Sequence, residues 1–266
     1  MKLSLIQMNV SEKKCDNINH ARTLLQEAAR MGADVVVLPE MFCCPYENPS
    51  FISNSEPIGS TVWMAMSEAA REHGIYLIAG SMPEKENERI YNTSFVFDPD
   101  GKQIARHRKI HLFDIDVPGG QYFRESDVFS AGNEITTFDT PWGKIGLCIC
   151  FDMRFPELAR GMMRRGAFLI VAPAAFNMTT GPAHWETTFR QRAVDNQVFT
   201  AGTAPARDIN GNYISYGNSL ICHPWGNILG RCEESESILT VDIDPEECKK
   251  IRMQLPLISS LRNDLY

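Results

Sequence analysis

Short runs of consecutive apolar residues are separated along the chain by longer stretches typical of amphipathic helices. The run VVVL at positions 35–38 has no polar face, which is typical of strands covered on both sides. Helices are predicted outside such runs, at positions 18–31, 61–73, 156–165 and 184–197. Strands that alternate with helices in this way indicate the α/β class.

Two parts of this pattern occur twice in the chain. The segment GADVVVLPE at 32–40 aligns with GAFLIVAPA at 166–174, each following a helical stretch. The segment SFVFDPDG at 94–101 aligns with SLICHPWG at 219–226, and both are typical of hairpins with Pro and Gly in the turn. The chain is therefore predicted to be internally duplicated.

A duplicated α/β chain favours one particular architecture. Positions 2–8 and 144–150 supply a strand that opens each half, and no linker separates the halves. We therefore expect a four-layer α-β-β-α sandwich of two β-sheets with outer helices. Residues 1–266 are expected to form a single domain.

The two copies differ where chemistry is expected. Strand ends are where α/β enzymes keep their sites. Three polar or reactive side chains stand where the other copy has an unrelated one: Glu40 opposite Ala174, Lys109 opposite Glu234, and Cys150 opposite Met8.

The stretch GLCICFDMRFPE at 146–157 places Cys150 between a predicted strand and a predicted helix. A buried structural thiol is the ordinary interpretation of such a cysteine. However, the following DMRFP is typical of a sharp turn into a helix, with Pro156 in the first helical turn. A helix N-terminus is expected to lower the thiol pKa and to offer N–H groups to an oxyanion, so Cys150 is a candidate nucleophile.

A nucleophilic thiol needs a base, and the residues leave two kinds open. His111, His184 and His223 are the histidine candidates, and Glu40 is the carboxylate candidate because burial at a strand end would raise its pKa. Neither the cysteine nor the histidine spacing suits a zinc site, so no metal is expected.

The composition limits the classes of binding partner and the cellular compartment that we expect. The net charge of -7 and pI near 5.4 argue against nucleic acid and against an anionic membrane surface. The first ten residues resemble a strand rather than a signal peptide, and the longest apolar run, at 168–176, is too short to span a membrane. Eight cysteines without a CxxC pair favour free thiols in a reducing compartment, so we expect a cytoplasmic protein.

Three motifs in order, VVVLPEMF around Glu40, HRKIHLFDI around Lys109 and GLCICFDMRFPEL around Cys150, resemble the nitrilase or carbon-nitrogen hydrolase superfamily. The segments CPY at 44–46, FDIDVPG at 113–119, FNMTTGPAHWE at 176–186 and RAVDNQV at 192–198 are most similar to its omega-amidase branch. The resemblance implies the same sandwich fold. It also implies hydrolysis of a terminal carboxamide through a Cys thioester, without cofactors, on alpha-keto acid amides such as alpha-ketoglutaramate and alpha-ketosuccinamate.

The resemblance also implies roles for individual residues. Cys150 would be the nucleophile, Glu40 the general base and later acid, and Lys109 the cation that stabilises the oxyanion together with the backbone N–H of Phe151. Glu125 would position Lys109 or the substrate. The segment GGQY at 119–122 departs from the omega-amidase pattern, which leaves the shape of this loop open.

The substrate-binding residues are a separate hypothesis. Arg154 is expected to bind the substrate carboxylate, with an ion pair to Glu157 or Asp152 as the alternative. A hydroxyl from Thr180 and apolar walls from Tyr46 and Phe176 would complete the pocket.

The resemblance also implies an oligomeric state, and several alternative functions remain beside the omega-amidase. A homodimer or higher homo-oligomer is expected, formed through helices near the nucleophile and the tail at 251–266. The nearest alternative function is another branch of the superfamily: a deaminated glutathione amidase, an N-carbamoyl hydrolase or a nitrilase. A Cys-His peptidase and a catalytically silent binding or scaffold protein are the more distant alternatives.

Overall fold

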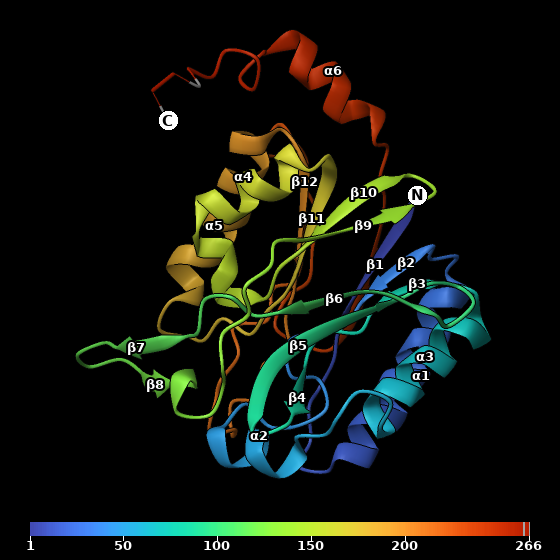
Figure 1. Cartoon of the computed structure of the whole chain (residues 1–266), viewed down its shortest axis with the longest axis vertical. Helices are drawn as coiled ribbons and strands as arrows, with labels where there is room; N and C mark the ends of the chain where they lie inside the picture. Colours follow the sequence, from blue (N-terminus) through green and yellow to red (C-terminus); the bar gives the residue numbers. More distant parts are fainter. Residues whose placement is uncertain (263, 266) are drawn as a thin grey trace.

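Two β-sheets pack face to face in the middle of the molecule, and helices cover their outer sides (Figure 1). The computed structural model describes residues 1–262, 264 and 265. The first sheet contains β1 (Lys2–Gln7), β2 (Val35–Val37), β3 (Tyr76–Ile78), β4 (Met82–Glu86), β5 (Arg89–Phe97), β6 (Gln103–Arg108) and β15 (Ser237–Asp242). The second contains β9 (Thr136–Thr140), β10 (Gly143–Leu147), β11 (Ala167–Pro173), β12 (Phe199–Thr203), β13 (Leu220–Cys222) and β14 (Ile228–Arg231).

The helices flank the two sheets on opposite sides. α1 (Lys14–Arg30) and α3 (Thr61–His73) lie on the first sheet, and α4 (Pro156–Arg164) and α5 (Gly181–Asn196) lie on the second. The remaining short elements are α2 (Asn48–Asn54), the hairpin β7 (Asp114–Asp116) and β8 (Tyr122–Arg124), α6 (Glu246–Gln254), and the 3-10 helices η1 (Glu125–Asp127) and η2 (Cys150–Arg154). This arrangement confirms the predicted α-β-β-α sandwich.

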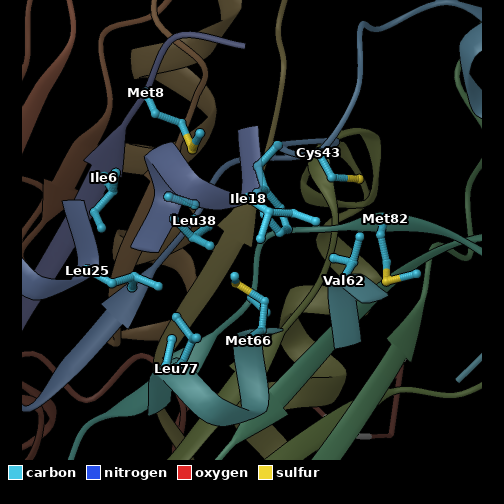
Figure 2. Close-up of a cluster of buried hydrophobic side chains, with 14 of the residues drawn as sticks. Ile6, Met8, Ile18, Leu25, Leu38, Cys43, Val62, Met66, Leu77 and Met82 are labelled. Carbon is cyan, nitrogen blue, oxygen red and sulfur yellow. The ribbon is translucent and has the colours of Figure 1, made fainter. Parts of the chain in front are cut away.

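The alternation of side chains along each strand explains the continuous apolar runs. Val35 and Val37 point between the sheets, where they join side chains of the second sheet such as Leu169 and Val171. Val36 points the other way and packs with α1 and α3. Figure 2 shows this outer layer, in which side chains such as Leu25 and Met66 gather around the first sheet. Both faces of β2 are thus buried, as the sequence predicts.

The two halves exchange their last strands. In each half the first three strands run parallel and a hairpin follows antiparallel: β1-β2-β3 with β5 and β6, and β10-β11-β12 with β13 and β14. The strand that closes the first half, β9, pairs with β10, and the strand that closes the second half, β15, pairs with β1. The duplication is therefore present in the fold, and the exchanged strands connect the halves.

Helix boundaries differ from the prediction at five places, and two of these are ends one residue earlier than predicted, α1 at Arg30 and α4 at Arg164. α1 begins at Lys14 rather than Ile18, because its first turn is polar and carries Asp16, which the helix dipole favours there. α5 begins at Gly181, where Pro182 occupies the first turn. Its end is also one residue earlier, because Gln197 adopts a left-handed conformation (φ 49°) and terminates the helix.

Two composition-based expectations can be compared with the structure. All eight cysteines are free thiols, and all except Cys15 are buried, as predicted. Within the described residues, the helices lack the length and apolar character that a membrane span requires.

Candidate active site

Cys150 lies at a strained turn between a strand and a helix. β10 ends at Leu147, and Cys150 opens a short 3-10 turn (Cys150–Arg154) that leads into α4 at Pro156. The φ angle of Cys150 is +47°, in a region that favours glycine. Such strain persists only where the surroundings hold the residue, and it is frequent at functional sites. The predicted sharp turn is therefore present.

Lys109 joins two carboxylates that come from different loops. Its Nζ lies 2.8 Å from Glu40 Oε1 and 2.9 Å from Glu125 Oε1, and all three side chains are fully buried. Lys109 directly follows β6, whereas Glu40 follows β2 by three residues. Although burial alone would lower it, the charges of Glu125 and Glu40 raise the pKa of Lys109. The two carboxylates therefore favour the charged form of Lys109.

Two further side chains fix the carboxylate of Glu40. Asn92 on β5 donates from Nδ2 to Glu40 Oε1 at 2.8 Å. The Tyr46 hydroxyl lies 2.6 Å from Glu125 Oε1 and 3.3 Å from Glu40 Oε1. Tyr46 was expected to form an apolar wall, and the structure adds a polar role for its hydroxyl. Glu40 Oε2, in contrast, is buried without a hydrogen-bond partner among the described residues.

The electrostatics of the thiol differ from the expectation. Burial raises the pKa of Cys150 well above its ordinary value, and the nearby Glu40 charge raises it further while Lys109 opposes. A helix N-terminus was expected to lower this pKa, but the 3-10 turn separates Cys150 from α4 and the residue is only 4% exposed. The thiol therefore needs a base to lose its proton.

Glu40 is the base that the geometry favours. Burial raises the pKa of Glu40 above its ordinary value of 4.5, although Lys109 opposes this effect. The histidine candidate His111 instead places its Nδ1 2.8 Å from Asp152 Oδ1. The charges of Glu40 and Lys109 act on the Cys150 thiol, and Glu40 is also within hydrogen-bonding reach of it.

Arg154 extends from the same turn without an acidic partner. Its Nη1 lies 3.0 Å from His184 Nδ1, and its guanidinium carbon lies 4.5 Å from the ring centre of Phe176. In the described part of the chain no carboxylate pairs with Arg154, so the alternative of an ion pair with Glu157 or Asp152 is not found. Desolvation by burial lowers the pKa of Arg154.

Two further predicted residues, Thr180 and Phe151, contact protein groups outside the Glu40 and Lys109 cluster. The Thr180 hydroxyl lies 3.3 Å from Asn177 Oδ1, so it is engaged at the start of α5. Asn177 also donates to Gln121 Oε1, in the GGQY segment that forms the tip of the protruding β7–β8 hairpin (Figure 1). Phe151 is half-buried directly after Cys150, with its ring 5.3 Å from that of Phe113.

Two site residues are absent from the sequence prediction. Asn92 begins a run of three buried polar residues on β5, Asn92, Thr93 and Ser94, and such a polar run inside a strand was a usable signal. Tyr213 lies in the loop between β12 and β13, donates its hydroxyl to the carbonyl of Ala175, and has its ring 4.4 Å from that of Tyr46. Its neighbours in the sequence, NGNYIS, indicate only a turn.

A cavity of about 100 Å³ opens beside this cluster. Its lining includes Glu40, Tyr46 and Tyr213, together with the acidic residues Glu47 and Asp208.

The buried Glu40, Lys109 and Cys150 on an α-β-β-α sandwich are the residues that the three motifs indicate for a hydrolase of carbon-nitrogen bonds. The family model for carbon-nitrogen hydrolase matches residues 2–253, and the chain belongs to this family. The omega-amidase NIT2 of Mus musculus is 49% identical to this chain, covering all of it and 96% of the relative. The omega-amidase NIT2 of Homo sapiens is 48% identical with the same coverage.

A solved structure supports the same assignment. Saccharomyces cerevisiae Nit3, a member of branch 10 of the nitrilase superfamily, is 39% identical to this chain with a TM-score of 0.91. The alignment covers 98% of this chain and 96% of the yeast chain. The resemblance that the three motifs indicate is therefore confirmed.

Proposed function

We propose that this chain is an omega-amidase that hydrolyses the terminal carboxamide of alpha-keto acid amides, such as alpha-ketoglutaramate and alpha-ketosuccinamate, to carboxylate and ammonia. The observation that carries amide hydrolysis is the buried cluster in which Lys109 contacts Glu40 and both act on the Cys150 thiol. The omega-amidase relatives support the choice of substrate.

The reaction begins with transfer of the Cys150 proton to Glu40. Burial raises the pKa of both Glu40 and Cys150. The resting site therefore holds a neutral Cys150 thiol beside an ionised Glu40, and the proton moves from sulfur to Glu40 only when the sulfur attacks. The sulfur forms a bond to the amide carbon. Glu40 then protonates the amide nitrogen, which departs as ammonia when the C–N bond breaks and leaves a thioester. After a water molecule enters, the same carboxylate takes a proton from that water as it attacks the thioester, and passes this proton to the Cys150 sulfur when the C–S bond breaks.

Lys109 and the backbone N–H of Phe151 stabilise the oxyanion of both tetrahedral intermediates. Glu125 and Glu40 hold the Lys109 ammonium from two sides, so the cation needs no reorganisation when charge develops on oxygen. Tyr46 and Asn92 hold the two carboxylates in place. The proposed reaction uses no metal and no organic cofactor.

Arg154 supplies the preference for a substrate that carries a carboxylate. A partly buried guanidinium without an acidic partner is costly to desolvate, and an anionic ligand would offset this cost. Phe176 below the guanidinium provides an apolar surface for the substrate chain. Thr180 remains a candidate hydroxyl donor if Asn177 releases it on binding.

The whole chain, 1–266, is proposed to act as a single hydrolase domain, in a homodimer or higher homo-oligomer. Figure 1 shows α6 and the segment after it extending beyond the sandwich, with Met253 76% exposed and Leu257 38% exposed. Of the tail at 251–266 that the sequence suggests for this contact, residues 263 and 266 lie outside the described residues. Free thiols throughout the chain favour the cytoplasm as its compartment.

The test compares two amides under the same conditions. Ammonia release from alpha-ketoglutaramate is expected to show a kcat/KM at least about tenfold above that for deaminated glutathione, equivalent to about 1.4 kcal/mol of transition-state binding. The opposite preference would assign the chain to another branch of the family, such as a deaminated glutathione amidase. No release from either amide, with Cys150 still reactive, would remove the substrate assignment.

A further inference from the structure

Cys150 and Lys109 lie on segments that are far apart in the sequence, so the chain itself does not fix the distance between them. Lys109 follows the edge strand β6, and Cys150 lies in the turn after β10 in the other sheet. Catalysis by positioned groups is sensitive to displacements of about 1 Å, which can cost about 100-fold in rate. A structural element that sets the distance between these segments is therefore required.

The carboxylate of Asp152 connects the two segments. It is fully buried, two residues after Cys150. Oδ2 accepts the backbone N–H of Ile149 at 3.1 Å, the residue directly before Cys150. Oδ1 accepts the backbone N–H groups of Ile110 at 3.2 Å and His111 at 2.9 Å, the residues directly after Lys109.

Two histidine rings complete the surroundings of this carboxylate. His107 Nε2 lies 2.9 Å from Oδ2, and its other ring nitrogen lies 3.0 Å from the hydroxyl of Thr136 on β9. His111 Nδ1 lies 2.8 Å from Oδ1, and its ring stacks on Phe155 with centres 3.6 Å apart. Three backbone N–H groups and two histidine rings thus contact the two oxygens of Asp152. A carboxylate can accept hydrogen bonds at both oxygens, whereas an amide in its place would have only one oxygen that accepts.

The same contacts keep Asp152 ionised. Burial alone would raise its pKa, but the hydrogen bonds from His107 and His111 hold it well below its ordinary value of 3.8. The carboxylate therefore keeps its acceptor character across the physiological pH range, and the bonds to the backbone on both sides persist.

We propose that Asp152 is a positioning residue that holds the Cys150 turn and the Lys109 segment at the distance that catalysis requires, with His107 and His111 orienting its carboxylate. Asp152 also binds the N–H before the strained Cys150, and so helps to hold its left-handed conformation. It acts through Cys150 and Lys109 rather than on the substrate. The inference rests on the proposed Glu-Lys-Cys mechanism.

The first test is Asp152→Asn. Whichever way the new amide turns, its NH₂ group faces a backbone N–H, so one side of the connection is lost. We expect kcat for the amide substrate to fall about 100-fold while KM stays within about threefold. The labelling rate of Cys150 by iodoacetamide, followed by peptide mass spectrometry, is expected to fall about tenfold because the thiol no longer faces its base.

Glu84→Gln is the matched control. Glu84 is also a buried carboxylate bonded to residues of β6, but through the side chains of Arg106 and Arg108, away from the Cys150 turn. It should lose stability with kcat and labelling close to those of the wild type. Equal loss of kcat in both variants, or faster labelling of Cys150 in Asp152→Asn, would identify a general packing role and overturn the proposal.

Two variants of His111 test the proposal even where Asp152→Asn does not fold. The His111 side chain is 29% exposed, so its replacement is tolerated more readily. His111→Ala loses both the bond to Asp152 and the stacking on Phe155, whereas His111→Gln loses the stacking but keeps a side-chain donor. Recovery of kcat by at least about threefold in His111→Gln supports positioning through Asp152; equal activities contradict it.

The labelling readout separates this proposal from the proposed function. If the wild-type chain releases no ammonia from any amide, the function fails, yet the labelling rates of the wild type, Asp152→Asn and Glu84→Gln still decide whether Asp152 positions the thiol. Wild-type rates in Asp152→Asn would overturn the proposal whatever the substrate is.

Discussion

Glu40 is the residue whose charge state should govern the acid side of the reaction. Only its ionised form can accept the Cys150 proton, and burial raises its pKa above 4.5. Lowering the pH through this raised pKa therefore removes the base, and kcat/KM should fall with a midpoint above 4.5. A pH profile of ammonia release checks this prediction. A midpoint at or below 4.5 would show that Lys109 outweighs burial.

Removal of the base should abolish turnover without unfolding the chain. In Glu40→Gln the amide keeps the shape and one acceptor oxygen, so Lys109 and Asn92 retain a partner. We expect a loss of about 10²- to 10⁴-fold in kcat, the range of general base catalysis. Circular dichroism should show an unchanged fold. Near-normal activity would mean that Glu40 is not the base and that a histidine is the better candidate.

Arg154→Lys separates substrate binding from structure at the same scale. Lysine keeps the charge but loses the planar pair of donors that matches a carboxylate. The KM for alpha-ketoglutaramate should therefore rise by about tenfold, with a smaller change for a neutral amide of similar length. Both substrates are measured by ammonia release. Equal losses on the two would mean that Arg154 mainly supports His184 and Phe176.

At the scale of elements, the backbone after β3 packs closely against the backbone that follows β2. Gly80, after β3, has a φ of +52°, and a Cβ atom there would lie 2.1 Å from the Pro39 carbonyl oxygen. Ser81 Oγ accepts the backbone N–H of Met41 at 3.1 Å. The position of Glu40 therefore depends on the absence of a side chain at residue 80.

Gly80→Ala should accordingly affect both stability and activity. Gly74 is a matched control, because it has a φ of +63° but open space around its Cβ position. Gly74→Ala should cost about 1–2 kcal/mol for the left-handed conformation alone. Gly80→Ala should cost roughly twice that or more, because the Pro39 backbone must also move. Urea unfolding and kcat report both effects, and equal costs for the two variants would contradict this account.

Elements with a strong local pattern could be predicted, and those fixed by distant partners could not. The buried run at 35–38 and the Pro-Gly hairpins carry their own signals, so the layers and the strand ends with Glu40, Lys109 and Cys150 follow from the sequence. The contacts of Asn92, Tyr213 and Asp152 join loops that are remote in sequence, and no local period encodes them. The thiol pKa was predicted wrongly because burial depends on the packing of those same loops.

At the scale of the whole molecule, the site is shared between the halves. Glu40, Lys109 and Glu125 come from the first half, and Cys150 and Arg154 come from the second. The exchange of β9 and β15 fixes one half against the other, since each strand covers the edge of the sheet opened by the other half. Neither half alone contains the set of groups that the proposed reaction requires.

Two shortened chains distinguish the role of β15 from that of the tail. A chain ending at residue 236 lacks β15, so β1 loses its antiparallel partner and presents an open edge; we expect aggregation or loss of cooperative unfolding. A chain ending at Leu255 keeps β15, α6 and the bond from Gln197 to the Leu255 carbonyl. It should therefore unfold cooperatively, with the tail contact removed.

Light scattering after size-exclusion chromatography checks the second chain. If the tail forms the proposed homo-oligomer contact, the chain ending at Leu255 should have a smaller mass than the full chain at the same concentration, because the apolar side chains beyond Leu255 no longer bury surface against a partner. An unchanged mass with retained activity would place the interface on the helices near the nucleophile instead. Loss of cooperative unfolding in this chain would mean that the tail supports α6 and the fold itself.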